Sequence, residues 1–179
     1  MKLTPFSYVI LVLVGRGGAG PHDLRRMAEI GRVYWSAAPS QWYAEPKRLL
    51  EAGLLTAEKQ PGRTRERTHY ALTDAGREAL ASWVRTPAAL PRMQHESIVR
   101  LLAADLVAPA AVLEGLRAMR PELEEALAHV GGQAEAADRL PARAPLLELN
   151  ARYAQRLLEA QLAWLDEAEA LLGAPARPS

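Results

Sequence analysis

The chain has 179 residues, enough for one large domain or two small ones with a buried core. It contains no cysteine, which excludes disulfides, thiol redox chemistry and thiolate metal sites. Residues 1–86 carry 13 lysines and arginines against 8 acidic residues, a net +5, whereas residues 87–179 carry 9 against 13, a net −4; this asymmetry indicates that the N-terminal half meets a polyanion.

The first predicted element is an apolar helix over residues 5–14. Thr4 can cap its N-terminus, and Pro5 suits the first helical position, where a missing N–H costs nothing. The apolar run spans roughly ten residues, about half of what a membrane-spanning helix needs. No signal-peptide cleavage pattern follows it. We therefore expect a buried helix in a cytoplasmic protein without a membrane segment.

Five more elements are predicted before residue 86, and together with the first they follow the order helix, helix, helix, strand, strand, helix. Gly53 suits the left-handed C-cap of the third helix, and Thr73 can cap the fourth. The two strands flank the basic loop "QPGRTRER". This order is that of a winged helix-turn-helix domain. The expected ranges are 5–14, 20–30, 37–53, 54–60, 67–72 and 73–84.

The C-terminal half is predicted to be entirely helical. Three helical patterns cover residues 93–107, 110–130 and 144–172, and Pro121 interrupts the second of them. The predicted fold class is therefore mainly α, an N-terminal winged helix-turn-helix followed by an all-helical dimerisation domain. The predicted domains are residues 1–86 and 87–173, and residues 174–179 are expected to form a disordered tail.

The last predicted helix carries two apolar stripes side by side, which is more than one packing face on a monomer needs. One stripe includes Tyr153, Leu157 and Trp164, and the other includes Leu165. We therefore expect a homodimer built mainly by this helix. The residues assigned to dimerisation are Tyr153, Leu157, Trp164 and Leu165.

The stretch "SQWYAEPKRLLEAGLLTAEKQPGRTRERTHYALTDAGREAL" resembles the signature of the PadR family of transcriptional regulators. The matching parts are Tyr43, the "KRLLEAGLL" exit and "THYALTDAGREAL". The C-terminal "ARYAQRLLEAQLAWLDEAEALL" resembles the long last helix of PadR-like proteins with a large dimerisation region. The resemblance implies a sequence-specific DNA-binding regulator, most often a repressor, that acts as a homodimer on double-stranded operator DNA and is released by a small aromatic ligand.

Candidate DNA contacts lie on the third helix and in the wing. Trp42, Pro46 and Leu49 form a stripe of the third helix that should pack inward, which leaves a polar face for the major groove. The basic wing is placed to contact phosphates. Taken alone, the same features would describe a solvated helix face and an ordinary exposed hairpin. The candidate residues are Ser40, Gln41, Tyr43, Lys47, Lys59, Arg63, Arg65 and Arg67.

Pro46 departs from the family pattern, which has an aliphatic core residue at this position of the third helix. A proline inside a helix removes one backbone hydrogen bond and clashes with the preceding turn. The helix is therefore expected either to be kinked or to begin later than the pattern suggests. Pro46 and the modest charge favour an alternative function, a winged-helix protein-interaction scaffold that does not bind DNA. A MarR-type regulator is a second alternative.

The scarce aromatic residues are candidates for the effector site. Trp83 lies near the expected junction of the two halves, and Trp35 and Trp164 are further candidates; the competing interpretation is core or interface packing for each. We expect no cofactor, metal or enzymatic activity. The four histidines lack metal-site spacing, and "GRGGAG" lacks the Lys-Ser/Thr of a phosphate-binding loop.

Overall fold

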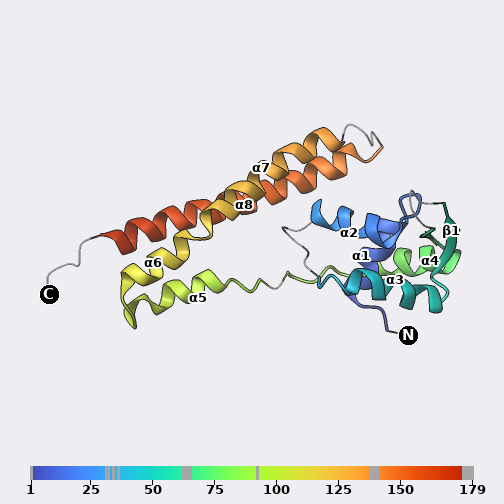
Figure 1. Cartoon of the computed structure of the whole chain (residues 1–179), viewed down its shortest axis with the longest axis horizontal. Helices are drawn as coiled ribbons and strands as arrows, with labels where there is room; N and C mark the ends of the chain where they lie inside the picture. Colours follow the sequence, from blue (N-terminus) through green and yellow to red (C-terminus); the bar gives the residue numbers. More distant parts are fainter. Residues whose placement is uncertain are drawn as a thin grey trace. The chain divides into compact units, whose positions relative to one another are not determined.

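The computed structural model describes residues 2–30, 33, 35, 37–61, 66–91, 93–137 and 142–174, of which 28–30 and 131–137 by their backbone only. The chain divides into two compact units, Met1–Leu90 and Pro91–Ser179 (Figure 1). The division falls four residues after the boundary expected at residue 86. Within the described ranges, no helix is both long and apolar enough to cross a membrane.

Unit 1 has the element order predicted from the sequence. Its helix α1 begins with a reciprocal cap, in which the Thr4 Oγ1 accepts from the Ser7 N–H at 3.2 Å and the Ser7 Oγ accepts from the Thr4 N–H at 2.8 Å. The helix is central to the unit, because Ile10 and Leu11 are fully buried. The elements are α1 (Pro5–Val14), α2 (Pro21–Ile30), α3 (Gln41–Glu51), β1 (Leu55–Gln60), β2 (Arg67–Leu72) and α4 (Asp74–Trp83).

The helix α3 contains Pro46 as its sixth residue and continues through it to Glu51. The helix begins at residue 41, four residues after the start expected from the sequence, and Pro46 lies inside it. The proline ring is fully buried, on the same face as Trp42 and Leu49. Its apolar packing offsets part of the cost of the lost backbone bond. After the helix, Gly53 has a φ of +72°, the left-handed conformation that glycine adopts without strain.

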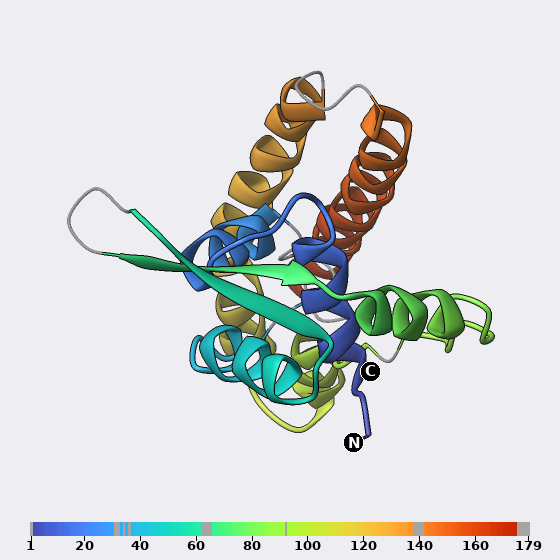
Figure 2. The same ribbon diagram turned by 90° about the vertical axis from the view of Figure 1, so that its right-hand side faces the viewer.

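The strands β1 and β2 form an antiparallel hairpin whose register runs from Leu55 opposite Leu72 to Gln60 opposite Arg67. Figure 2 shows the two strands extending beyond the helices of unit 1. The base of the hairpin is buried, because Leu55 and Tyr70 belong to the core that α1 and α3 also supply. The hairpin is therefore a wing that is anchored at its base, with most of β1 exposed and most of β2 half-buried.

Unit 2 consists of helices, as predicted. The second helical pattern is divided at residues 118–119, so that Pro121 falls in the first turn of the next helix, where its missing N–H is tolerated. Pro109 is in the same way the first residue of a helix. The elements are α5 (Glu96–Leu102), a 3₁₀ turn (Ala103–Asp105), α6 (Pro109–Arg117), α7 (Arg120–Ala137) and α8 (Ala144–Gly173).

The helices α7 and α8 lie side by side and antiparallel, and α6 packs against the C-terminal part of α8 (Figure 1). The fully buried Leu116 and Leu165 join α6 to α8 in an apolar core. Around it, Arg120 donates to Glu169 at 2.8 Å and to Asp166 at 2.5 Å. Both partners of this arginine lie on α8, so the two ion pairs join the start of α7 to α8.

Candidate nucleic-acid interface

The helix α3 presents a polar face to solvent. Trp42 and Leu49 are buried, as the apolar stripe predicts, and the ring of Trp42 meets Phe6 of α1 edge-on with centroids 4.9 Å apart. Because the helix turns about 100° per residue, the positions between the buried ones face outward. The exposed residues of this face are Ser40, Gln41, Tyr43, Ala44 and Lys47.

The N-terminal end of α3 has a local hydrogen bond that holds Gln41. Its Oε1 accepts from the Ala38 backbone N–H at 3.0 Å, which leaves the Nε2 of the amide as the group able to donate elsewhere. Ser40 precedes the helix in an αR conformation and its hydroxyl makes no capping bond. Gln41 and Ser40 therefore offer exposed donors at the start of the helix.

The wing carries exposed cations on both strands. Lys59 and Arg67 are exposed, and the Nζ of Lys59 lies 3.4 Å from the Thr68 Oγ1 on the opposite strand. Arg63 and Arg65 lie outside the described residues. The described part of the wing therefore places one lysine and one arginine close to its outer end, in neighbouring pairs of the ladder.

The end of α3, the wing and the start of α4 are tied together at Thr73. Its hydroxyl donates to the Gly53 carbonyl at 2.8 Å and accepts from the Gly76 N–H at 3.0 Å. Its backbone N–H donates to the Leu54 carbonyl at 3.2 Å. A side chain at Gly76 would bring its Cβ within 2.2 Å of the same Leu54 oxygen, so this close contact requires glycine. The "LTDAG" segment thus sets the angle between α3 and β2.

The glycine-rich loop after α1 supports the wing from the other side. Ala19 pairs with Tyr70 of β2 through two backbone hydrogen bonds of 3.0 Å. A Cβ at Gly18, where φ is +86°, would lie 2.0 Å from the His69 Nε2. The role of this loop was not predicted from the sequence, where its signal is the glycine cluster; the structure shows that Gly18 makes room for β2.

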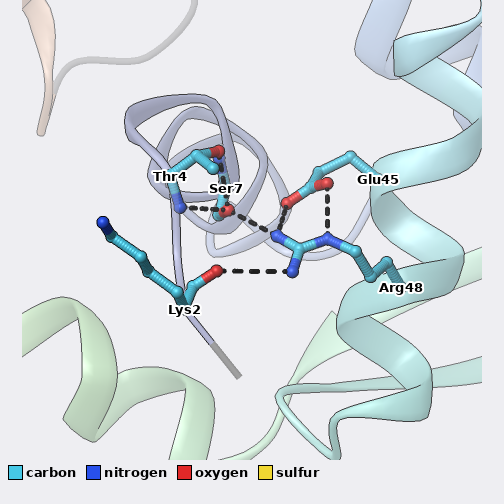
Figure 3. Close-up of polar contacts among 5 residues, drawn as sticks. All are labelled: Lys2, Thr4, Ser7, Glu45 and Arg48. Carbon is cyan, nitrogen blue, oxygen red and sulfur yellow. Dashed lines mark hydrogen bonds and ion pairs between the residues drawn. The ribbon is translucent and has the colours of Figure 1, made fainter.

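A polar network joins α3 to α1 at Arg48 (Figure 3). Its guanidinium pairs with Glu45 through two nitrogens, and its Nη2 donates to the buried Ser7 Oγ at 2.9 Å. Its Nη1 lies 3.5 Å from the Lys2 carbonyl oxygen. Hydrogen bonding from Arg48 lowers the pKa of the Glu45 carboxyl, which outweighs the opposite effect of burial. These residues carry no signal in the sequence, because the network joins positions 41 residues apart.

The three tryptophans considered for an effector site differ in their surroundings. Trp83 is 39% exposed and stacks on Tyr8, with ring centroids 4.5 Å apart and planes at 6°. Trp35 packs against the core of unit 1 and stacks on Phe6. Trp164 packs against the core of unit 2 and meets His95 edge-on. Among these three, Trp83 has the most accessible ring.

The two stripes of α8 have different surroundings. Leu165 is fully buried against α6 of its own chain, which differs from the expectation that it forms part of a dimer surface. Leu157 and Trp164 are half-buried, whereas Tyr153 is 53% exposed. The neighbouring Leu149 is 58% exposed and was not assigned to the dimer surface from the sequence. The stripe that contains Tyr153 is therefore the one left open.

The arrangement of unit 1 is that of a winged helix-turn-helix domain, and the sequence comparisons agree. Residues 20–82 match the transcriptional regulator PadR-like family, and residues 93–173 match the virulence activator alpha C-terminal domain. These two matches together span most of the chain, and they favour the PadR-like family over the MarR-type alternative. The negative transcriptional regulator PadR of Bacillus subtilis is 35% identical over 81 residues, a match that spans 44% of this chain and 44% of that relative.

Solved structures of two relatives share the fold over most of both chains. Bacillus subtilis PadR in complex with operator DNA has a TM-score of 0.81 at 21% identity, covering 96% of this chain and 99% of that one. The same protein in complex with p-coumaric acid has a TM-score of 0.71 at 22% identity, covering 94% and 99%. The Vibrio cholerae virulence activator AphA has a TM-score of 0.74 at 26% identity, covering 95% and 99%.

Proposed function

We propose that the chain is a homodimeric, sequence-specific DNA-binding regulator that places α3 in the major groove and the wing on the phosphate backbone. The observation that carries this proposal is the exposed face of α3 beside an exposed, basic wing. The Thr73 ties hold the two at one angle. The PadR of Bacillus subtilis, which was solved on operator DNA, supports the same use of the fold. The proposal gives the chain a cytoplasmic location and no catalytic step.

Repression is the proposed direction of regulation, because the Bacillus subtilis relative is a negative regulator. The competing proposal, a scaffold that does not bind DNA, loses its main support. Pro46 leaves α3 continuous, and the outward positions at the start of the helix include the polar side chains of Ser40, Gln41 and Lys47.

The two groups of contacts are expected to respond differently to mutation. A phosphate contact releases counterions, so log K for DNA binding falls as the salt concentration rises. Each of the variants Arg67→Ala, Arg65→Ala and Lys59→Ala should reduce the magnitude of the slope of log K against log salt concentration by about 0.9 per chain. These losses should be similar on any duplex. Gln41→Ala should instead cost roughly 1–3 kcal/mol on the preferred duplex and much less on a scrambled one.

The measurement is a salt titration of binding to a duplex selected by the unmodified chain from a randomised library, with a scrambled duplex beside it. Arg77→Ala is the matched control, because this arginine pairs with Asp74 on α4, away from the wing. An unchanged slope for all three wing variants would remove the wing from the interface. A selection that enriches no sequence would favour the scaffold.

A second proposal concerns the effector. The exposed indole of Trp83, stacked on Tyr8, is favoured as the site of a small planar aromatic ligand over Trp35 and Trp164, which pack in cores. The complex of Bacillus subtilis PadR with p-coumaric acid makes that compound the probe. We expect it to quench tryptophan fluorescence in the unmodified chain and in Trp164→Phe, but not in Trp83→Leu. Quenching that survives in Trp83→Leu would remove Trp83 from the site.

A further inference from the structure

The polar network at Arg48 lies inside the helix that carries the proposed base contacts, yet it is directed toward α1. Each nitrogen of the Arg48 guanidinium has a protein acceptor: Glu45 for Nε and Nη2, Ser7 also for Nη2, and the Lys2 carbonyl for Nη1. Ser7 is fully buried, and it is the one buried polar or charged residue among the described part of the chain. The network is therefore built into the fold rather than attached to its surface (Figure 3).

The network lies beside Pro46, where α3 lacks one backbone hydrogen bond. Pro46 has no N–H, so the Trp42 carbonyl lacks the donor that would normally come from four residues further along. The backbone of α3 is therefore less tightly bonded between its first turn, which carries Gln41 and Tyr43, and its second half. Glu45 precedes the proline and Arg48 follows it, so their ion pair links the two sides.

We propose that Arg48 is a positioning residue that holds the start of α3 in the orientation needed for reading base edges, through Glu45 on its own helix and Ser7 on α1. This inference rests on the proposed DNA-binding function. Arg48 acts without contacting the nucleic acid, because Glu45 neutralises its charge and each of its three side-chain nitrogens already donates within the protein. Its loss is therefore expected to reduce sequence discrimination rather than general attraction to DNA.

The experiment compares Arg48→Met with Arg77→Met. Arg77 is a matched control, since it pairs with Asp74 three residues before it, as Arg48 pairs with Glu45, but both of its hydrogen bonds are made within α4. Affinity is measured on the duplex that the unmodified chain selects from a randomised library and on a scrambled duplex of the same composition, each over a range of salt. Thermal unfolding of each variant establishes that it is folded.

For Arg48→Met we expect a loss of roughly tenfold in affinity for the selected duplex, the effect of removing a charged hydrogen bond, with little change on the scrambled one. The salt slope should stay the same. Arg77→Met should behave like the unmodified chain. Arg48→Lys should recover only part of the loss, because an ammonium cannot replace a fork that reaches two helices.

Ser7→Ala tests the same link from α1 and removes little volume, so it serves if Arg48→Met does not fold. It should lower discrimination in the same direction, and the double variant should lose little more than Arg48→Met alone. Equal losses on both duplexes with a slope reduced by about 0.9 would assign Arg48 to a phosphate contact and overturn the proposal. Discrimination unchanged in both Arg48→Met and Ser7→Ala would also overturn it. A failed selection with the unmodified chain would instead reject DNA binding itself.

Discussion

Several residues in unit 1 make close contacts with parts of the chain that are distant in the sequence. Ser7 caps α1 and at the same time accepts from Arg48, so its buried hydroxyl is satisfied from two directions. Gly18 and Gly76 leave space where a Cβ would collide with His69 and with the Leu54 carbonyl. The small size of these residues therefore has a structural reason that the neighbouring sequence does not reveal.

The first prediction concerns acid and Glu45. Its pKa is lowered in the folded chain by Arg48, so the ion pair stabilises the fold above the ordinary glutamate pKa. That contribution is lost as the pH falls from the ordinary glutamate pKa through the lowered pKa of the folded chain. The reason is that Glu45 takes up a proton at a higher pH in the unfolded chain than in the folded chain. We expect the free energy of unfolding of Glu45→Gln to lie below that of the unmodified chain at neutral pH.

The difference should shrink in acid, as followed by chemical denaturation at a series of pH values. The control is the same substitution in an Arg48→Met background, where the partner that lowers the pKa is gone and the pH dependence of the difference should largely disappear. A difference that grows in acid would contradict the assigned direction of the pKa shift.

At the scale of elements, hydrogen bonds from neighbouring segments of unit 1 position α3 and the wing. α3 ends at a left-handed Gly53, the wing begins two residues later, and the capping residue of α4 reaches back to bond the turn after α3. The wing is held from its other side by the backbone pairing of Ala19 with Tyr70. The helix and the wing are therefore positioned by hydrogen bonds that lie outside both of them.

The second prediction tests the tie at Thr73. Thr73→Ala removes the N-cap of α4 and the donor to Gly53 together, so unfolding should become easier by about 1–2 kcal/mol, at the upper end for a lost cap. Thr86→Ala is the matched control, because the Thr86 hydroxyl donates to Trp83 at the exposed end of α4 and bonds no second element. Urea unfolding measures both variants, and equal losses would show that the tie adds nothing to a simple cap.

At the scale of the whole molecule, the long helix α8 serves two purposes. One stripe, with Ala154, Leu158 and Leu165, is buried within the chain. The other leaves Leu146, Leu149 and Tyr153 exposed, and α5 likewise has no buried residue, with Val99 and Leu102 open to solvent. Exposed apolar side chains such as those of the α8 stripe are typical of a surface that a partner covers.

The third prediction is that the exposed stripe of α8, which includes Leu149 and Tyr153, forms the interface of the proposed homodimer. A two-fold dimer would present two copies of α3 about one turn of DNA apart. Leu149→Glu together with Tyr153→Glu should yield a folded monomer, because charge is introduced on the exposed stripe and not in the core. Analytical ultracentrifugation at micromolar concentration measures the state, and Gln155→Glu on the exposed polar side of the same helix is the control. An unaltered dimer in the double variant would exclude this stripe, as would a monomeric unmodified chain.

Local patterns were sufficient to predict most elements of this protein. The capping residues Thr4 and Thr73, the glycine at 53 and the apolar stripe of α3 each act within a few residues of their position. The predicted element ends in unit 1 lie within two residues of the observed ones, except the start of α3, whereas in unit 2 the second predicted pattern forms two helices. The order of these elements predicted the fold, and the "THYALTDAGREAL" motif predicted the family, for the same reason, since both are read from short segments.

Other features depended on which residues far apart in the chain come together. The place of Leu165 in the core, the exposure of Tyr153 and the bond of Arg48 to Ser7 are set by packing between helices. The sequence pattern indicates that two faces of α8 are apolar. It does not indicate which of the two faces packs against α6 of the same chain. Similarly, Pro46 looks unfavourable from the sequence because the pattern shows only the lost backbone bond. The tertiary structure adds the buried ring and the ion pair that spans it, and these let α3 remain one helix.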